Sequence, residues 1–311
     1  MRVLHLSDTQ LSGSPYRISS LLSKYGGVES KHFVWQEKIF YREFPVDLSK
    51  KNTTLDEIRY LIYEWADVIV YHNRWRRQEV FKALGTAPPN KPSVIQIHSP
   101  REGENFREEV KSGLPIACFA QYHPRQWPEC KFILPNVVDI YDSSYIRETF
   151  PSNPIPIVSY APSNTNRIDW NNKSYGVVAP ILKKLKLKGA IKFQLLQQLP
   201  FEKIMPEKKL SDIGIDEISC SYHLSSLEYL SLGIPCFAYI DSSIEKVVKD
   251  ITGAEELPWI RATEGTFERL LGKMLKEKNW AGRGKRSREW MERYWNPLFL
   301  CDQYLNVYRS L

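Results

Sequence analysis

The sequence predicts an α/β protein with two doubly wound parallel sheets and a closing helix. Three observations support this fold class. Apolar runs of strand length alternate with stretches of helical periodicity along nearly the whole chain, as βαβ units require. The length of 311 residues is enough for two domains. The segment 151–156, PSNPIP, carries three prolines in six residues and divides the alternation into two halves.

These signals define the expected domain limits. We place an N-terminal domain at residues 1–152, a C-terminal domain at 153–295 and a final helix at 296–311. Pro297 stands where that helix begins, a position that suits proline. We expect the helix to cross back and pack on the N-terminal domain.

Composition and charge narrow the class of protein. Apolar residues make up 42% of the chain, which is ample for a globular core. There are 43 Lys and Arg against 36 acidic residues, and the net charge of +7 suits an anionic partner such as a nucleotide diphosphate, a phospholipid surface or nucleic acid. Basic clusters at 182–188 and 283–288 are either parts of that surface or ordinary solvated helix faces.

The N-terminal residues and the cysteines indicate the cellular compartment that we expect for the protein. The first ten residues, MRVLHLSDTQ, lack an apolar run of signal-peptide length, and no stretch is long and apolar enough to span a membrane. The five cysteines are scattered and form no C-x-x-C pair, so reduced thiols are expected. We therefore expect a soluble cytoplasmic protein, with peripheral contact to the inner membrane face as a further option.

The N-terminal half opens with a strand, a small-residue loop and a helix. The strand is Val3–Ser7, and the helix begins near Pro15. Gly13 and Ser14 then lie at the carboxyl end of the sheet, where backbone N–H groups can hold an anion or a sugar hydroxyl. A plain tight turn explains the same residues equally well.

Three further strands in this half each end in a histidine. The apolar runs 67–71, 93–97 and 116–122 are followed by His72, His98 and His123. In a parallel sheet these side chains emerge at the same edge. They are metal ligands, ligand contacts or structural residues, and spacing alone does not choose among these roles.

The segment 211–241 is the strongest functional signal in the C-terminal half. It predicts a strand, a loop, a helix that contains Glu228, a turn at Gly233–Pro235 and a second strand. Such a unit places one carboxylate near the carboxyl edge of a parallel sheet, where ligands usually bind. The other interpretation is that Glu228 is a solvated helix residue.

The sequence of 220–235, CSYHLSSLEYLSLGIP, resembles the signature of retaining GT-B glycosyltransferases of glycosyltransferase family 4. That signature has two glutamates with seven residues between them, typically E-G-F-G-x-x-x-L-E-A-x-A-x-G-x-P. Glu228, Gly233 and Pro235 match its second glutamate, glycine and proline, whereas Cys220 replaces the first glutamate. The resemblance covers nearly the whole chain and implies two Rossmann-like domains.

The resemblance also implies roles for individual residues. Glu228 would accept hydrogen bonds from the nucleotide ribose, and Cys220 would alter the contact to the transferred sugar. Arg167 and Lys173 would neutralise the donor diphosphate, and His98 would hold the transferred sugar without acting as a base. The other donor contacts we expect are Gly13, Ser14, Lys209, His223, Leu224 and Ser225.

The sequence thus predicts a retaining, hexosyltransferase-like glycosyltransferase that moves a sugar from a UDP- or GDP-sugar to a glycan or lipid-linked acceptor. Because no Asp-x-Asp motif is present, we expect no metal and no other cofactor. The alternative acceptor is a hydroxymethylated DNA base, as in bacteriophage glycosyltransferases of the same architecture. A sugar-nucleotide 2-epimerase and a nucleotide-sugar-binding protein without catalysis are the remaining hypotheses.

Overall fold

The computed structural model describes residues 1–36, 44–73, 77–99, 111–121, 126–148, 153–163, 165–166, 174–197 and 199–311. These residues form two compact units. The first contains Met1–Val137 and Pro297–Leu311, and the second contains Val138–Asn296. The final helix is therefore part of the first unit, and the boundary expected at 152/153 falls inside the second.

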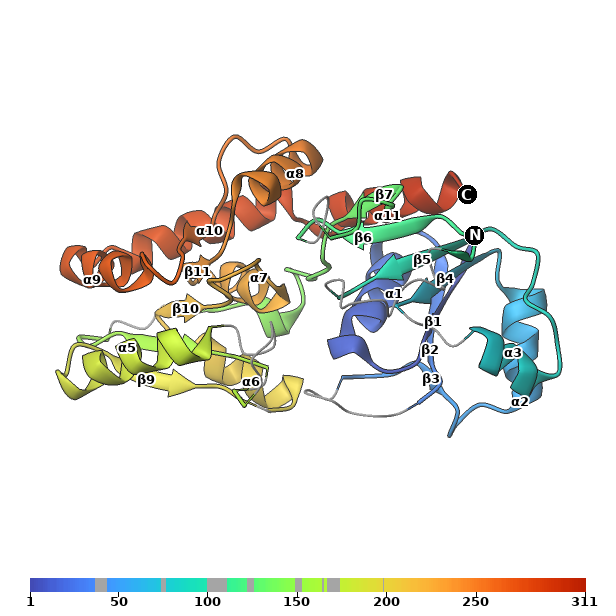
Figure 1. Ribbon diagram of the computed structural model, residues 1–311, viewed down its shortest axis with the longest axis horizontal. Helices are drawn as coiled ribbons and strands as arrows, with labels where there is room; N and C mark the ends of the chain where they lie inside the picture. Colours follow the sequence, from blue (N-terminus) through green and yellow to red (C-terminus); the bar gives the residue numbers. More distant parts are fainter. Residues whose placement is uncertain are drawn as a thin grey trace. The chain divides into compact units, whose positions relative to one another are not determined.

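The first unit is built on a parallel sheet with seven described strands in the order β3-β2-β1-β4-β5-β6-β7 (Figure 1). The chain runs from β1 outward to β3 and then returns to β4, next to β1. The strand order therefore reverses between β1 and β4, and ligands of such sheets bind at this kind of point. The strands are β1 (Arg2–Ser7), β2 (Glu29–Val34), β3 (Leu48–Ser49), β4 (Val68–His72), β5 (Ser93–Ile97), β6 (Ile116–Phe119) and β7 (Phe132–Leu134).

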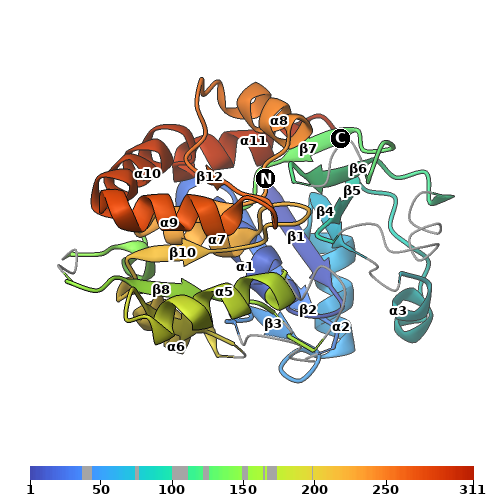
Figure 2. The same cartoon turned by 60° about the vertical axis from the view of Figure 1, so that its left-hand side comes forward.

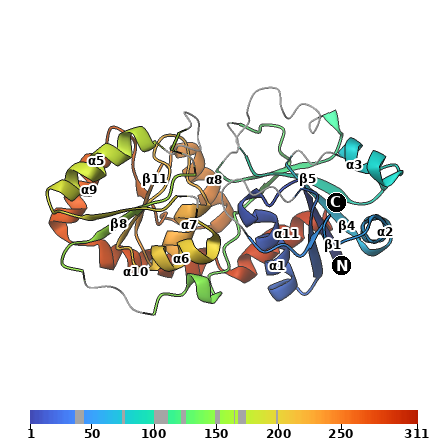
Figure 3. The ribbon, with the colours of Figure 1, turned by 90° about the horizontal axis from the view of Figure 1, so that it is seen from below.

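Local sequence signals explain where the helices of this unit begin. Pro15 lies in the first turn of α1, and Thr54 and Glu57 cap α2 reciprocally. Helix α2 continues directly into one wider turn, η2. Helix α11 packs beside α1 (Figure 3). The described elements are η1 (Leu11–Gly13), α1 (Ser14–Tyr25), α2 (Leu55–Tyr60), η2 (Leu61–Trp65), α3 (Arg77–Leu84) and α11 (Pro297–Arg309).

The second unit has a parallel sheet with five described strands in the order β12-β11-β10-β8-β9. Here the strand order reverses between β8 and β10, so these two strands mark the corresponding switch point. The strands are β8 (Ile157–Tyr160), β9 (Lys192–Leu195), β10 (Ile213–Ile215), β11 (Cys236–Ala238) and β12 (Ile260–Arg261).

Helices cover both faces of this second sheet. Helices α5 and α9 lie on one face, and α6, α7 and α10 lie on the other (Figure 2). The described helices are η3 (Ser143–Tyr145), α5 (Tyr175–Leu187), α6 (Phe201–Lys209), α7 (Leu224–Ser231), α8 (Ser242–Thr252), α9 (Phe267–Glu277) and α10 (Trp280–Tyr294).

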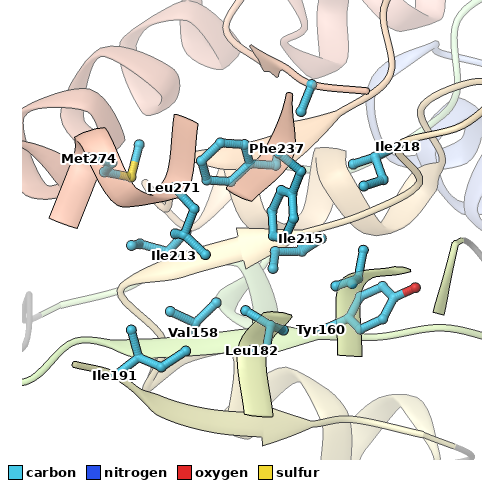
Figure 4. Packing of buried hydrophobic residues seen from close by; sticks show 13 residues of the cluster. Val158, Tyr160, Leu182, Ile191, Ile213, Ile215, Ile218, Phe237, Leu271 and Met274 are labelled. Carbon is cyan, nitrogen blue, oxygen red and sulfur yellow. The ribbon is translucent and has the colours of Figure 1, made fainter. Parts of the chain in front are cut away.

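Residue size on alternate strand positions decides how closely each layer packs. Large apolar side chains such as Val158, Ile213 and Phe237 point into the core beneath α5 and α9 (Figure 4). The intervening positions are small, and Gly214 lets the ring of Tyr229 on α7 lie directly against the strand. A Cβ on Gly214 would lie 2.4 Å from that ring, so α7 packs closer than a larger residue would permit.

The predicted fold class is confirmed by these two α/β units. The strand predicted at 93–97 coincides with β5, and the strand predicted at Val3–Ser7 lies within β1. The short strands β3, β7 and β12 were not predicted. Within the described ranges, no helix has the length and apolar character needed to cross a membrane.

Candidate functional site

Buried polar side chains cross the switch point of the first sheet on one face. Register pairs Ser7 with His72 and His5 with His32, so the side chains of these four residues point to the same face. His98 follows β5 two residues after Gln96, the register partner of His72. Four polar positions on β1, β2 and β4 and one position directly after β5 are thereby brought together.

Three of these histidines contact one another through their ring nitrogens. His5 Nδ1 is 2.9 Å from His72 Nε2, and His72 Nδ1 is 2.5 Å from His98 Nε2. Burial is the main cause that lowers the pKa of His5 and His72 well below the usual value, and it lowers the pKa of His98 to about 3. We call His5, His72 and His98 the histidine chain. At neutral pH its rings are uncharged.

Residues from neighbouring strands and loops hold His98 in place. Asn73 Oδ1 accepts the backbone N–H of His98 at 2.6 Å, and Asn73 itself adopts a left-handed backbone with φ of 51°. The indole of Trp127 donates to the Ser99 carbonyl oxygen at 3.1 Å, and the ring of Phe119 meets His98 edge-on. The sequence-predicted His98 is thus a rigidly positioned side chain.

The metal-ligand interpretation of the histidines finds no support in this geometry. The two nitrogens of His72 face two different rings, so they do not converge with others on one point. Among the described residues there is no group of three or more His, Cys, Asp or Glu side chains arranged to hold a metal ion. His123 lies outside the described residues.

Gly13 is required by packing at the start of α1. Its φ is 76°, and a Cβ there would lie 2.2 Å from the ring of Phe44. The Gly13 N–H donates to the Gln10 carbonyl oxygen at 2.8 Å, and the Gln10 side chain bonds both backbone groups of Phe44. Ser14 is buried behind this turn. The tight-turn interpretation therefore has a physical basis.

Two carboxylates that sequence reasoning missed lie at the carboxyl edge of the second sheet. Asp216 and Glu217 directly follow β10, and both are fully buried. Glu217 Oε1 accepts the Ser219 backbone N–H at 2.7 Å and the Ser174 hydroxyl at 2.9 Å. Burial, aided by these two carboxylates, raises the pKa of Tyr160 well above its usual value. Acidic residues directly after a buried strand are the signal that could have identified them.

The start of α7 is held by Asp216. Asp216 Oδ2 accepts the backbone N–H of His223, the N-cap residue, at 2.6 Å. None of the described side chains caps the helix itself, so its first turn, which includes Leu224 and Ser225, presents backbone N–H groups at the sheet edge. The arrangement provides a positive helix end suited to a phosphate group.

Glu228 is buried rather than solvated. Its Oε2 lies 2.5 Å from Lys208 Nζ, and neither side chain is more than 1% exposed. Lys208 Nζ also donates to Ser225 Oγ at 2.8 Å and lies over the ring of Tyr229. The interpretation of Glu228 as a solvated helix residue is wrong, and Lys208 is its ion-pair partner.

The neighbouring lysine has a different position. Lys209 Nζ donates to the Ser143 carbonyl oxygen at 2.8 Å. Lys208, which was not predicted, is the lysine of α6 that reaches Glu228. Arg167 and Lys173, the two expected diphosphate ligands, lie outside the described residues. Cys220 is half-buried in the loop ahead of α7 and is not in a disulfide.

The glycine and proline of the signature join α7 to its neighbours. Gly233 ends α7 with φ of 66°, and Pro235 leads into β11. Helix α10 approaches this turn so closely that a Cβ on Gly284 would lie 2.0 Å from the Gly233 carbonyl oxygen. These two signature residues therefore have a packing role that is independent of any ligand.

Comparisons with known proteins found structures with a similar fold. No protein-family model and no curated protein sequence matches it. The chain is similar to HepE of Anabaena, whose structure contains UDP and glucose, with a TM-score of 0.66, 12% identity and complete coverage of both chains. It is also similar to sucrose-phosphate synthase of Thermosynechococcus elongatus, with a TM-score of 0.64, 11% identity and coverage of 100% of this chain and 99% of that one.

A third similar structure extends the same likeness. O-GlcNAc transferase of Thermobaculum terrenum aligns with a TM-score of 0.57 and 14% identity over 100% of this chain and 68% of that one. At these identities the likeness concerns the fold. The two parallel-sheet units and the full-length alignments show that the chain has the GT-B fold.

Proposed function

We propose that the protein is a retaining glycosyltransferase that transfers a sugar from a UDP- or GDP-sugar to an acceptor hydroxyl. The observation that carries the proposal is the edge of the second sheet, where the uncapped first turn of α7 and the carboxylate of Glu228 belong to one short helix. The full-length likeness to HepE, a protein with UDP and glucose in its structure, supports a nucleotide-sugar donor.

Phosphate binding is assigned to the second unit. The N-terminal turn of α7, with His223, Leu224 and Ser225, binds the donor diphosphate through backbone N–H groups. Arg167 and Lys173 supply the positive charge that stabilises the departing nucleoside diphosphate, with Lys209 as a further donor-side cation. The diphosphate is thus met by residues of the chain and a helix terminus, and the proposed chemistry needs no metal ion.

Recognition of the ribose and of the sugar is assigned to separate residues. Glu228 accepts hydrogen bonds from the ribose hydroxyls, and His98 holds a hydroxyl of the transferred sugar. Gly13 and Ser14 contribute a turn that contacts the donor. In a retaining transfer a leaving phosphate oxygen takes the acceptor proton on the same face of the sugar, so His98 need not act as a base.

A nucleotide-sugar screen tests the donor class. A donor present at a hundred times its dissociation constant stabilises the folded state by roughly 2.7 kcal/mol, which raises the melting temperature measurably. We expect stabilisation by one UDP- or GDP-sugar and release of its nucleoside diphosphate. If none of them stabilises the protein, the donor assignment is wrong; binding without any diphosphate release would favour a binding protein.

The role of Glu228 can be separated from its ion pair. Glu228→Gln is expected to lower donor affinity in calorimetry, but it also leaves Lys208 buried without its partner. The double variant Glu228→Gln with Lys208→Met removes both charges. If Glu228 contacts the ribose, the double variant stays weak; recovery of affinity would mean that Glu228 only balances Lys208.

The acceptor is a glycan or lipid-linked saccharide under this proposal, with contact to an anionic membrane face. The net charge of +7 also suits DNA carrying hydroxymethylated bases. Duplex DNA binding falls steeply with salt because counterions are released. A salt titration with DNA therefore distinguishes the two: steeply salt-dependent DNA binding supports the DNA acceptor, and its absence supports the saccharide.

A further inference from the structure

The histidine chain of His5, His72 and His98 is a continuous path of ring nitrogens across the β1–β4 switch point. His72 is its middle member, with Nε2 2.9 Å from His5 Nδ1 and Nδ1 2.5 Å from His98 Nε2. Both distances are within hydrogen-bond range. His5 and His72 are almost completely shielded from solvent. The three rings therefore constrain one another directly.

Counting hydrogens limits the states of these rings. A neutral imidazole has one N–H and one lone pair, so each contact needs a donor on one side and an acceptor on the other. Burial lowers the pKa of all three rings, so none carries a charge at neutral pH. His72 would have to be charged to donate to both neighbours or to accept from both. It must therefore donate to one neighbour and accept from the other.

Only two arrangements satisfy both contacts. When His72 donates through Nδ1, His5 donates through Nδ1 as well, and His98 keeps its hydrogen on Nδ1. When His72 donates through Nε2, all three rings carry their hydrogen on Nε2. We propose that His5 and His72 are positioning residues that hold His98 in the tautomer all three rings share, so that the rings change tautomer only together.

The two terminal rings of the histidine chain show how this coupling affects ligand binding. His98 Nδ1 and His5 Nε2 are buried atoms that have no hydrogen-bond partner among the described residues. This step rests on the proposed function, in which His98 Nδ1 is the atom that binds the sugar. A sugar oxygen that accepts a hydrogen bond selects the Nδ1–H state, and a hydroxyl that donates selects the Nε2–H state. His5 and His72 thereby influence sugar recognition from beneath the site.

His32 provides an internal reference in the same sheet. The Ser7 hydroxyl donates its hydrogen to the Thr9 carbonyl oxygen at 2.7 Å, so it accepts from His32 Nε2, which is also 2.7 Å away. His32 therefore carries its hydrogen on Nε2. It is fully buried and lies opposite His5 in the strand register, yet it is not part of the chain.

Nuclear magnetic resonance of the full-length protein with ¹⁵N-labelled histidine tests the shared tautomer without any substrate. We expect one tautomer common to His5, His72 and His98, with ¹⁵N–¹⁵N couplings across both contacts, and the Nε2–H tautomer for His32. Different tautomers in any two rings of the chain would overturn the inference. So would assigned ring resonances that show no coupling across the contacts.

Two variants extend this test. His72→Leu should leave His98 in a mixture of tautomers and lower kcat for sugar transfer more than it changes KM for the donor. The matched control, His32→Leu, should leave the shared tautomer intact. In His72→Leu, the Nε2–H signal of His32 reports whether the sheet is folded. If this variant does not fold, the ¹⁵N–¹⁵N couplings of the wild-type protein alone test the inference. A single His98 tautomer in folded His72→Leu contradicts the inference.

The resonance test and the donor test can fail separately. A shared tautomer in a protein that binds no nucleotide sugar would reject the proposed function and keep the coupling of the rings. Donor binding and sugar transfer by a protein whose rings adopt different tautomers would reject the coupling and keep the proposed function.

Discussion

At the scale of single residues, Lys208 and Glu228 form a buried ion pair in the second unit. Two charges that are no more than 1% exposed have lost their hydration, and each depends on the other for compensation. Ser225 accepts a further hydrogen bond from Lys208, and the ring of Tyr229 lies beneath the ammonium group. Lys208 of α6 therefore contacts three side chains of α7, which holds the two helices together.

Removing one partner of this pair should be costly. Lys208→Met leaves the Glu228 carboxylate buried and uncompensated, which we expect to lower the free energy of unfolding by about 3–5 kcal/mol. The double variant Lys208→Met with Glu228→Gln should recover most of that loss. Denaturant unfolding of the three proteins measures both effects. Equal stability of Lys208→Met and the wild type would show that the pair is not formed.

At the scale of elements, the approach of α10 to the end of α7 depends on a glycine. Gly284 and Gly282 both lie inside α10, but a Cβ on Gly284 would meet the Gly233 carbonyl oxygen. Among the described residues, a Cβ on Gly282 would have only the end of Arg286 within 4 Å. The same substitution therefore has opposite expected effects two residues apart.

Alanine at these two positions gives a matched pair of variants. Gly284→Ala should destabilise the second unit by about 1–3 kcal/mol, because the helix must move away from the turn. Gly282→Ala should stabilise it by about 0.5–1 kcal/mol through helix propensity. Urea unfolding compares the two. If Gly284→Ala were as stable as Gly282→Ala, the close packing of α10 on the Gly233 turn would be disproved.

Sequence patterns were sufficient for the longer elements, but not for the short strands or for the side-chain partners. The order of strands and helices from β8 to β11 follows from apolar runs and turn residues, and Glu228 was recognised from its spacing to Gly233 and Pro235. The pairing with Lys208 was missed because it depends on how α6 lies against α7, which no local pattern encodes. The contact between His5 and His72 was missed for the same reason, since it requires the β1–β4 register.

At the scale of the whole molecule, buried neutral histidines tie stability to pH. The pKa of His32 and of His98 falls from the ordinary 6.5 to about 3 on folding, mainly through burial, and those of His5 and His72 are lowered as well. Below pH 6.5 the unfolded chain binds protons that the folded chain does not. The contribution of these histidines to the free energy of unfolding is therefore fully present above pH 6.5 and is lost as the pH falls towards 3.

This linkage predicts a steep acid dependence. Each such histidine contributes a slope of up to about 1.4 kcal/mol per pH unit between the two pKa values. The free energy of unfolding should fall between pH 7 and pH 5, before most carboxylates titrate. Replacing His32 by Leu should make this slope shallower. A free energy of unfolding that is unchanged between pH 7 and pH 5 would mean that the rings are not buried and neutral.

The most direct measurement of the proposed function follows the anomeric configuration of the released sugar. The nucleotide sugar that stabilises the protein is incubated with it without acceptor, and ¹H magnetic resonance records the first product before mutarotation. The proposal predicts slow release of nucleoside diphosphate and a sugar with the anomeric configuration of the donor. A product of inverted configuration would contradict retention, and no release with any UDP- or GDP-sugar would contradict glycosyl transfer itself.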